Sequence, residues 1–164
     1  MKSPKSGSAP SFCSCLRGVA VAVLDGKLYA VGGYNAGYLN SVERYDPALD
    51  AWEAVAPMAS ARDEFAVAVL DGKLYAVSGY NIDDGYLSSV ERYDPTTNAW
   101  EAVAPMSTAR DEFASAVLDG KLYAVGGDSD DGFLSSVERY DPALNAWETV
   151  APMGTARIGS IALV

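Results

Sequence analysis

The chain of 164 residues contains no histidine. This absence excludes imidazole-based acid–base catalysis, a Ser-His-Asp triad and histidine-ligated metal sites. Only two cysteines are present, Cys13 and Cys15. They lie too close together for a relaxed mutual disulfide in an extended chain, so we expect ordinary thiols. We predict no catalytic residue, no metal site and no cofactor.

Basic residues are scarce, with 12 Lys and Arg against 22 Asp and Glu and a net charge of -10. Nucleic acid and anionic membrane surfaces would repel such a chain, so neither is expected as a partner, and a basic partner is favoured. No apolar run approaches the ~20 residues of a membrane-spanning helix. Residues 1–16 are predicted to form a flexible tail rather than a secretory signal, which makes cytoplasmic location the expectation.

What the sequence does contain is a repeat. The segment Asp-Gly-Lys-Leu-Tyr-Ala-Val begins at Asp25, Asp71 and Asp119, at intervals of 46 and 48 residues. Each copy continues through Ser-Val-Glu-Arg-Tyr-Asp-Pro to a tryptophan and then Ala-Pro-Met. A period of this length indicates propeller blades or a solenoid. The copies are similar enough for recent duplication or deliberate idealisation, and both explanations are open.

Each copy predicts four short strands. In the second copy, the β-prone runs 66–70 and 73–77 flank Asp71-Gly72, a linker suited to a type I′ hairpin because glycine tolerates positive φ. The runs 89–93 and 98–103 alternate apolar and polar residues, and each ends at a turn or proline. We call the four strands A to D in chain order. One copy is therefore predicted to be a four-stranded antiparallel meander, and the chain all-β.

The Gly-Gly pair at the end of strand B (Gly32-Gly33 and Gly126-Gly127), followed by a Tyr and a Trp at fixed spacing, resembles the kelch repeat. The resemblance covers residues 17–164 and implies three blades of a β-propeller, at about 17–58, 62–106 and 110–153. Blade 2 has Ser78 in place of the first glycine, and Gly79 is expected to supply the unusual backbone conformation. The three tryptophans are expected to fill the space between sheets. They are Trp52, Trp100 and Trp147.

Three blades make half a propeller, because rings typically close with 4–8. Residues 157–164 form a further predicted strand A, one strand more than a closed ring needs. Two explanations are open. Either two chains join head to tail as a homodimer with a six-bladed ring, in which this segment displaces residues 17–24 of the other chain, or the chain is a fragment of a longer propeller.

In the kelch family, the loops from B to C and from D to A lie on one face, which often docks peptides or proteins. This resemblance implies a non-enzymatic protein-interaction scaffold for a protein or peptide partner, which the charge predicts to be basic. Arg62, Arg110 and Arg157 recur in the D–A loops and are interpreted as interblade or loop-fixing groups that pair with nearby carboxylates, and only secondarily as contacts for a partner. The aspartate-rich segment 128–132 lacks the EF-hand pattern and is interpreted as a solvated acidic loop. The predicted binding residues are Tyr34, Glu64, Tyr80, Asp83, Asp84, Tyr86, Glu112, Asp128, Asp130 and Asp131.

A second function remains open, that of a small-molecule or sugar-directed kelch protein. The copper oxidase of the family that acts on galactose needs histidine ligands, which this chain lacks. An enzyme similar to the sialic acid mutarotases needs only acid–base groups. Against it, the carboxylate-rich motifs recur blade by blade, which is typical of a scaffold rather than of one active site.

Overall fold

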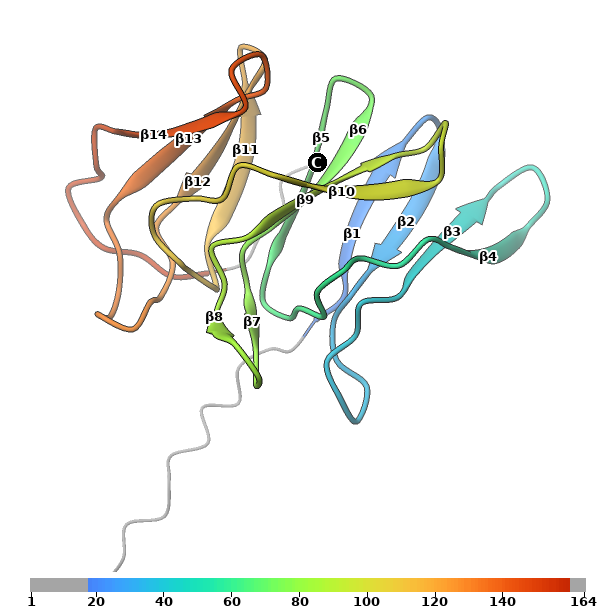
Figure 1. Cartoon of the computed structure of the whole chain (residues 1–164), viewed down its shortest axis with the longest axis horizontal. Helices are drawn as coiled ribbons and strands as arrows, with labels where there is room; N and C mark the ends of the chain where they lie inside the picture. The colour runs from blue at the N-terminus through green and yellow to red at the C-terminus, as the bar shows by residue number, and fades with distance from the viewer. Residues whose placement is uncertain (1–17, 160–164) are drawn as a thin grey trace, which may run out of the picture.

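The computed structural model describes residues 18–159. Three four-stranded antiparallel sheets stand side by side like the blades of a fan (Figure 1). Blade 1 consists of β1 (Ala20–Leu24), β2 (Lys27–Val31), β3 (Val42–Asp46) and β4 (Ala51–Val55). Blade 2 consists of β5 (Ala66–Leu70), β6 (Lys73–Val77), β9 (Val90–Asp94) and β10 (Ala99–Val103). Blade 3 consists of β11 (Ala114–Leu118), β12 (Lys121–Val125), β13 (Val137–Asp141) and β14 (Ala146–Val150).

The predicted meander is confirmed in every blade, with each strand paired to the next in chain order. The hairpins between strands A and B have positive φ at both loop residues, for example 52° at Asp71 and 68° at Gly72. These angles fit the predicted type I′ turn. The first strands of neighbouring blades, β1, β5 and β11, contact one another along the inner side of the fan. A short ladder in blade 2, between β7 (Tyr80–Asn81) and β8 (Gly85–Tyr86), was not predicted.

Apolar side chains fill the two spaces between blades. Between blades 1 and 2, Tyr29 meets Tyr93 with ring centroids 5.8 Å apart. Between blades 2 and 3, Tyr75 meets Tyr140 at 5.7 Å. Side chains alternate between the two faces of a strand, so a blade that is covered on both sides needs apolar residues at nearly every position. Blade 2 meets this requirement, and four of the five residues of its strand β6 are buried.

Gly79 adopts the expected positive φ of 98°, and Ser78 has a positive φ of 59° as well. Two other expectations need correction. Trp100 and Trp147 lie partly buried between blades, whereas Trp52 is 48% exposed because no described blade precedes blade 1. Of the predicted surplus strand, residues 157–159 form no strand, and residues 160–164 lie outside the described residues, as do the predicted tail and both cysteines.

No helix in the described part of the chain is long and apolar enough to cross a membrane.

Candidate functional site

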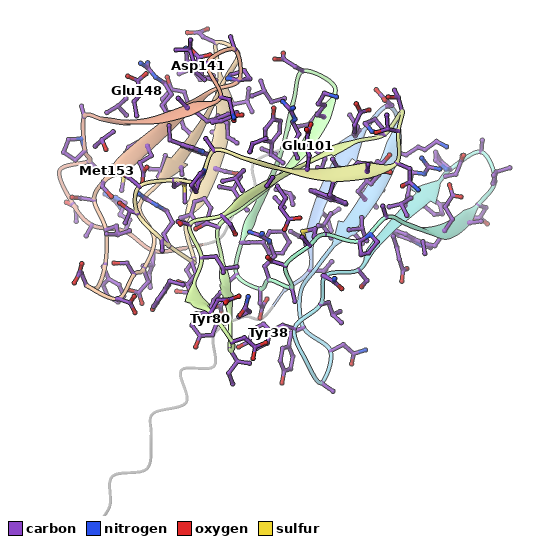
Figure 2. All side chains as sticks on the ribbon, in the orientation of Figure 1. Tyr38, Tyr80, Glu101, Asp141, Glu148 and Met153 are labelled. Carbon is purple, nitrogen blue, oxygen red and sulfur yellow. The ribbon has the colours of Figure 1, made fainter. Side chains whose placement is uncertain are left out.

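One edge of the fan, which we call the loop face, carries two kinds of connection. The B–C loops span residues 32–41, 78–89 and 126–136, and the D–A loops span residues 56–65, 104–113 and 151–159. These loops gather at one end of the blades, opposite the A–B hairpins and the turn at Asp141 (Figure 2). The strands provide a rigid support, and the loops present the side chains that are free to contact a partner.

Backbone pairing between blades positions this face. The D–A loops after blades 1 and 2 pair with the residue that follows Ser78-Gly79 in blade 2 and Gly126-Gly127 in blade 3. Asp63 N donates to Tyr80 O at 3.0 Å, and Tyr80 N donates to Asp63 O at 2.9 Å. Asp111 and Asp128 repeat this exchange at 3.0 and 2.9 Å. Such a close approach requires glycine beside it, because a Cβ on Gly79 would lie 2.6 Å from the carbonyl oxygen of Asp63.

Four tyrosines form a continuous row across blades 1 and 2, which we call the tyrosine row. Tyr34 lies edge-on to Tyr38 with ring centroids 5.4 Å apart, and Tyr80 lies edge-on to Tyr86 at 5.6 Å. Tyr38 and Tyr80 join the two pairs across the blades at 6.1 Å (Figure 2). Tyr86 continues the row toward blade 3, because its hydroxyl donates to Asp128 Oδ2 at 3.4 Å. Edge-on contacts of this kind stabilise the arrangement.

Four carboxylates on the inner side of the same face form an acidic cluster: Glu64, Asp111, Glu112 and Asp128. Burial, together with the charge of Glu64 and its hydrogen bond, raises the pKa of Asp111 to about 8; Glu112 and Asp128 add to the effect. Burial and the charges of Asp111 and Asp128 raise the pKa of Tyr86 to about 12. Burial is the first cause of both pKa shifts, and the neighbouring carboxylates add to it. The negative charge of these carboxylates favours a bound cation.

The tips of the B–C loops carry the other predicted carboxylates. Asp83, Asp84, Asp130 and Asp131 are all exposed. Asn81 organises the blade 2 tip, since its Oδ1 accepts from the backbone N–H of Asp83 and Asp84 at 3.0 and 2.8 Å. Ser129 organises the blade 3 tip, where its hydroxyl donates to Gly132 O at 3.0 Å. Each tip is therefore a turn bonded to itself, with carboxylates at its surface.

The structure thus brings together Tyr34, Tyr80 and Tyr86 in the row, and Glu64, Glu112 and Asp128 in the cluster, while Asp83, Asp84, Asp130 and Asp131 stay at the tips. Sequence reasoning missed Tyr38 and Asp111, and also the exposed apolar side chains Ile82 and Phe133. The repeat pattern could have identified two of these residues, Tyr38 and Phe133. Tyr38, Tyr86 and Phe133 occupy one repeated position, directly before the leucine of each B–C loop.

The described residues contain no group of three or more His, Cys, Asp or Glu side chains that could hold a metal ion. The loop face presents aromatic rings and carboxylates, with one buried acid of raised pKa.

Repeated four-stranded blades with a positive-φ pair after the second strand define the class of kelch-type β-propellers. The family model described as the KLHDC2/KLHL20/DRC7 kelch-repeats domain matches residues 2–161, and the chain belongs to this family. A solved structure, that of YjhT, superposes with a TM-score of 0.72 at 20% identity, covering 84% of this chain and 52% of that one. This likeness supports the fold.

Curated relatives match over single repeats. Influenza virus NS1A-binding protein homolog B of Danio rerio is 49% identical over 49 residues, which cover 29% of this chain and 8% of that protein. Kelch-like protein 35 of Homo sapiens is 50% identical over 42 residues, or 25% of this chain and 7% of that protein. The matched segments thus span less than a tenth of the length of these relatives.

Proposed function

We propose that this chain is a non-enzymatic protein-interaction module whose loop face binds a basic protein or peptide segment. The observation that carries the proposal is the juxtaposition of the tyrosine row with the acidic cluster, joined through Tyr86 and Asp128. The kelch family membership and the relative named for binding influenza virus NS1A support a protein as the kind of partner. Cytoplasmic location stays a prediction.

The two parts of the face suit a Lys- or Arg-rich ligand in different ways. The carboxylates provide a negative field that attracts and orients cations. Aromatic ring faces add a cation–π contribution of ~0.5–1 kcal/mol each at exposed sites. Two of the three D–A loop arginines, Arg62 and Arg110, are buried and paired with Glu91 and Glu138, so they do not neutralise this field at the surface. The third, Arg157, is exposed.

Two carboxylate-to-amide variants with the same charge change test the proposal. The first changes Asp83, Asp84, Asp130 and Asp131 to Asn. The matched control changes Asp25, Asp50, Asp71 and Asp119 to Asn on the opposite edge, where all four are exposed and have positive φ, which Asn tolerates. Binding of an Arg/Lys-rich peptide and an acidic peptide of equal length is measured by calorimetry at low and physiological salt.

The basic peptide should bind the unmodified chain and the control alike, and the loop-tip variant should weaken it by at least about tenfold at low salt. Binding should decline with salt, because exposed charges are screened over ~8 Å at physiological ionic strength. Tyr38→Leu removes a ring face and keeps an apolar side chain, so it should lower affinity without changing the salt dependence. Equal losses in the loop-tip variant and the control, or no binding of either peptide, would reject the proposal.

One observation favours a second candidate, an acid–base enzyme acting on a sugar. The buried carboxyl of Asp111, with its pKa raised to about 8, shares hydrogen bonding with Glu64 and is suited to hold and release a proton near neutral pH. The test is the anomer interconversion rate of reducing sugars by proton NMR. A rate increase that is lost in Asp111→Asn would favour the enzyme over the scaffold.

A further inference from the structure

The D–A loops after blades 1 and 2 each contain an arginine whose side chain enters the following blade. Arg62 leaves blade 1 and is fully buried in blade 2, where its Nη1 donates to Ser78 O at 2.7 Å and its Nη2 to Glu91 Oε1 at 2.8 Å. Arg110 leaves blade 2 and repeats the contacts in blade 3, with Gly126 O and Glu138 Oε1, both at 2.8 Å. The serine that precedes the receiving glutamate by two residues also accepts from each arginine.

The same loop makes two further contacts with the receiving blade. The receiving glutamate also accepts backbone N–H groups of the loop, as Glu138 does from Ser107 at 2.8 Å and Thr108 at 3.1 Å. The tryptophan of the receiving blade donates to the alanine carbonyl before the proline, as Trp147 does to Ala104 at 2.9 Å. In blade 2, Glu91 and Trp100 make the same hydrogen bonds with the loop that follows blade 1. A blade–blade junction therefore has a fixed set of donors and acceptors.

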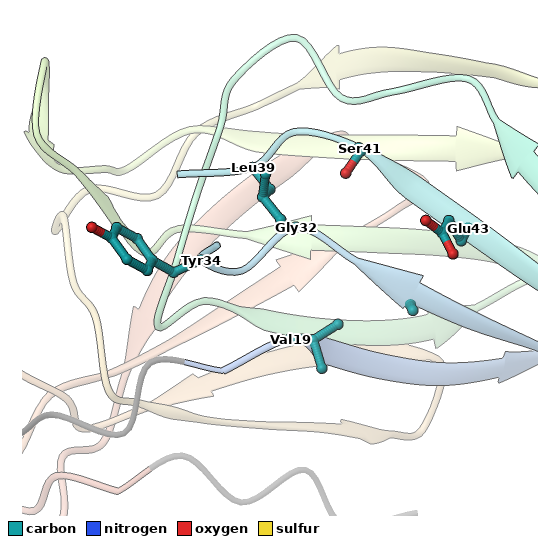
Figure 3. Close-up of a pocket in the computed structure, with 7 residues that line it drawn as sticks. Val19, Gly32, Tyr34, Leu39, Ser41 and Glu43 are labelled. Carbon is teal, nitrogen blue, oxygen red and sulfur yellow. The ribbon is translucent and has the colours of Figure 1, made fainter. Parts of the chain in front are cut away.

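Blade 1 carries the receiving half of this junction without a loop from the described chain to fill it. Its residues Gly32, Ser41 and Glu43 match the positions that hold Arg62 and Arg110, and they line a hollow of about 320 Å³ (Figure 3). Glu43 is exposed, whereas its counterparts Glu91 and Glu138 are buried. Trp52 is exposed in the same way.

Blade 3 carries the donating half. The backbone of Arg157 is already placed like that of Arg110, since Gly127 N donates to its carbonyl at 2.8 Å and its N–H donates to Leu134 O at 3.1 Å. The equivalent bonds of Arg110, from Gly79 and to Leu87, measure 2.9 and 3.2 Å. The side chain of Arg157 is nevertheless exposed, and it has no ion pair within residues 18–159. The donating loop is thus preformed.

The sheet faces beside the two half-junctions are apolar and uncovered. Val21 on the outer side of blade 1 is 42% exposed, against 6% for its counterpart Val67 in blade 2. Leu118 on the outer side of blade 3 is 58% exposed, against 4% for Leu70 in blade 2. Covering both faces would bury the residues that form the cores between blades elsewhere in the chain.

We propose that two copies of this chain associate head to tail, with Arg157 of each copy bound by Ser41 and Glu43 of the other. The two equal contacts close a ring of six blades, within the 4–8 typical of propellers. A second copy is the favoured occupant because it supplies the same loop that fills the junctions of blades 2 and 3. The inference does not depend on the ligand of the loop face.

Charge reversal tests the contact directly. Glu43→Arg and Arg157→Glu each place like charges in both junctions of a homodimer, so each variant alone should be a monomer by sedimentation velocity at tens of micromolar. Mixed together, the two variants form one native and one reversed junction, and a heterodimer should appear. Glu53→Arg on the exposed outer strand is the matched control and should sediment like the unmodified chain. All changed side chains are at least partly exposed, and circular dichroism checks that the variants fold.

The unmodified chain should be a dimer, and Glu43→Gln should raise its dissociation constant at least about 100-fold. Acrylamide quenching of Trp52 should increase on dilution as this side chain becomes exposed.

A monomer at all concentrations, or a Glu43→Arg variant that dimerises normally, would overturn the proposal. Larger species that grow with concentration would overturn the closed ring, since a head-to-tail contact that does not close makes filaments. A monomer with quencher-shielded Trp52 would show that the chain's own residues cover blade 1.

Discussion

A buried guanidinium group needs a counter-charge and hydrogen bonds, and the receiving blades provide both. Burial lowers the pKa of Arg62 and Arg110, while Glu91 and Glu138 oppose the effect. Glu138 is itself buried, yet hydrogen bonds from Ser107 and Arg110 hold its pKa below the usual range. The Nε atoms of both arginines lack a hydrogen-bond partner within the described residues. The carboxylate contact is therefore the main compensation for burying each cation.

Glu138→Gln should lower the free energy of unfolding by about 3–5 kcal/mol, because it leaves Arg110 buried without a counter-charge. The matched control is Glu148→Gln, which removes the exposed partner of Arg139 and should cost less than about 1 kcal/mol. Urea unfolding measures both. A Glu138→Gln value as small as that of the control would mean that the buried pair contributes little.

At the scale of the single blade, the same sequence has different environments according to its neighbours. Trp100 contacts Tyr93 with ring centroids 5.2 Å apart and donates to Ala56 O of blade 1. Trp52 has the same contact with Tyr45, at 5.3 Å, but no described blade lies on its other side. The tryptophan of a blade therefore contributes to the junction with the preceding blade, in addition to its contact within its own blade.

Trp100→Ala should cost about 3 kcal/mol, at the lower end of the range for a large aromatic residue because the side chain is only partly buried. Trp52→Ala should cost less than about 1 kcal/mol when measured at concentrations where the chain is monomeric. Thermal unfolding of the two variants side by side provides the comparison. Equal losses would show that the tryptophans act within their own blades.

At the scale of the whole molecule, the acidic cluster links all three blades. Glu64 lies in the loop after blade 1, Asp111 and Glu112 in the loop after blade 2, and Asp128 in blade 3. The loops are also joined by backbone bonds, from Glu112 N to Glu64 O at 3.1 Å and from Gly159 N to Glu112 O at 2.8 Å. Bringing the blades together therefore concentrates negative charge near the inner side of the fan.

The raised pKa of Asp111 predicts that stability falls as pH rises from about 4 to about 8. Below about pH 4, Asp111 is protonated in both the folded and the unfolded chain. Between about pH 4 and 8, the folded chain retains a proton that the unfolded chain has lost, so rising pH favours unfolding. The slope should reach at most about 1.4 kcal/mol per pH unit. Three other aspartates have lowered pKa values: Asp46, Asp94 and Asp141. They lower the free energy of unfolding as pH falls, and only below about pH 4.

Asp111→Asn should flatten this slope and stabilise the chain at pH 8, as measured by the thermal midpoint between pH 5 and 8. If the thermal midpoint of the unmodified chain does not change over this range, Asp111 ionises in the folded state as easily as in the unfolded state. The pKa of Asp111 would then not be raised.

The strands and hairpins were predictable from local sequence. Strand A and strand B of blade 2 were predicted at 66–70 and 73–77 and are observed at those residues, because a β-prone run beside Asp-Gly specifies a hairpin without help from distant residues. The repeat itself then predicted the number of blades and their class. The pairing of Arg62 and Arg110 with carboxylates was also predictable, since recurrent arginines in an acidic chain need partners.

What only the tertiary structure decided is which copies of an identical motif are covered. Three exposed residues occupy the same repeat positions as more buried residues in the other blades: Trp52, Glu43 and Arg157. They are exposed because burial depends on a neighbouring sheet, which the local sequence does not reveal. The acidic cluster depends in the same way on distance between loops that are far apart in the chain. Asp111 is one of many acidic residues in the sequence, and only packing against Glu64 gives it a raised pKa.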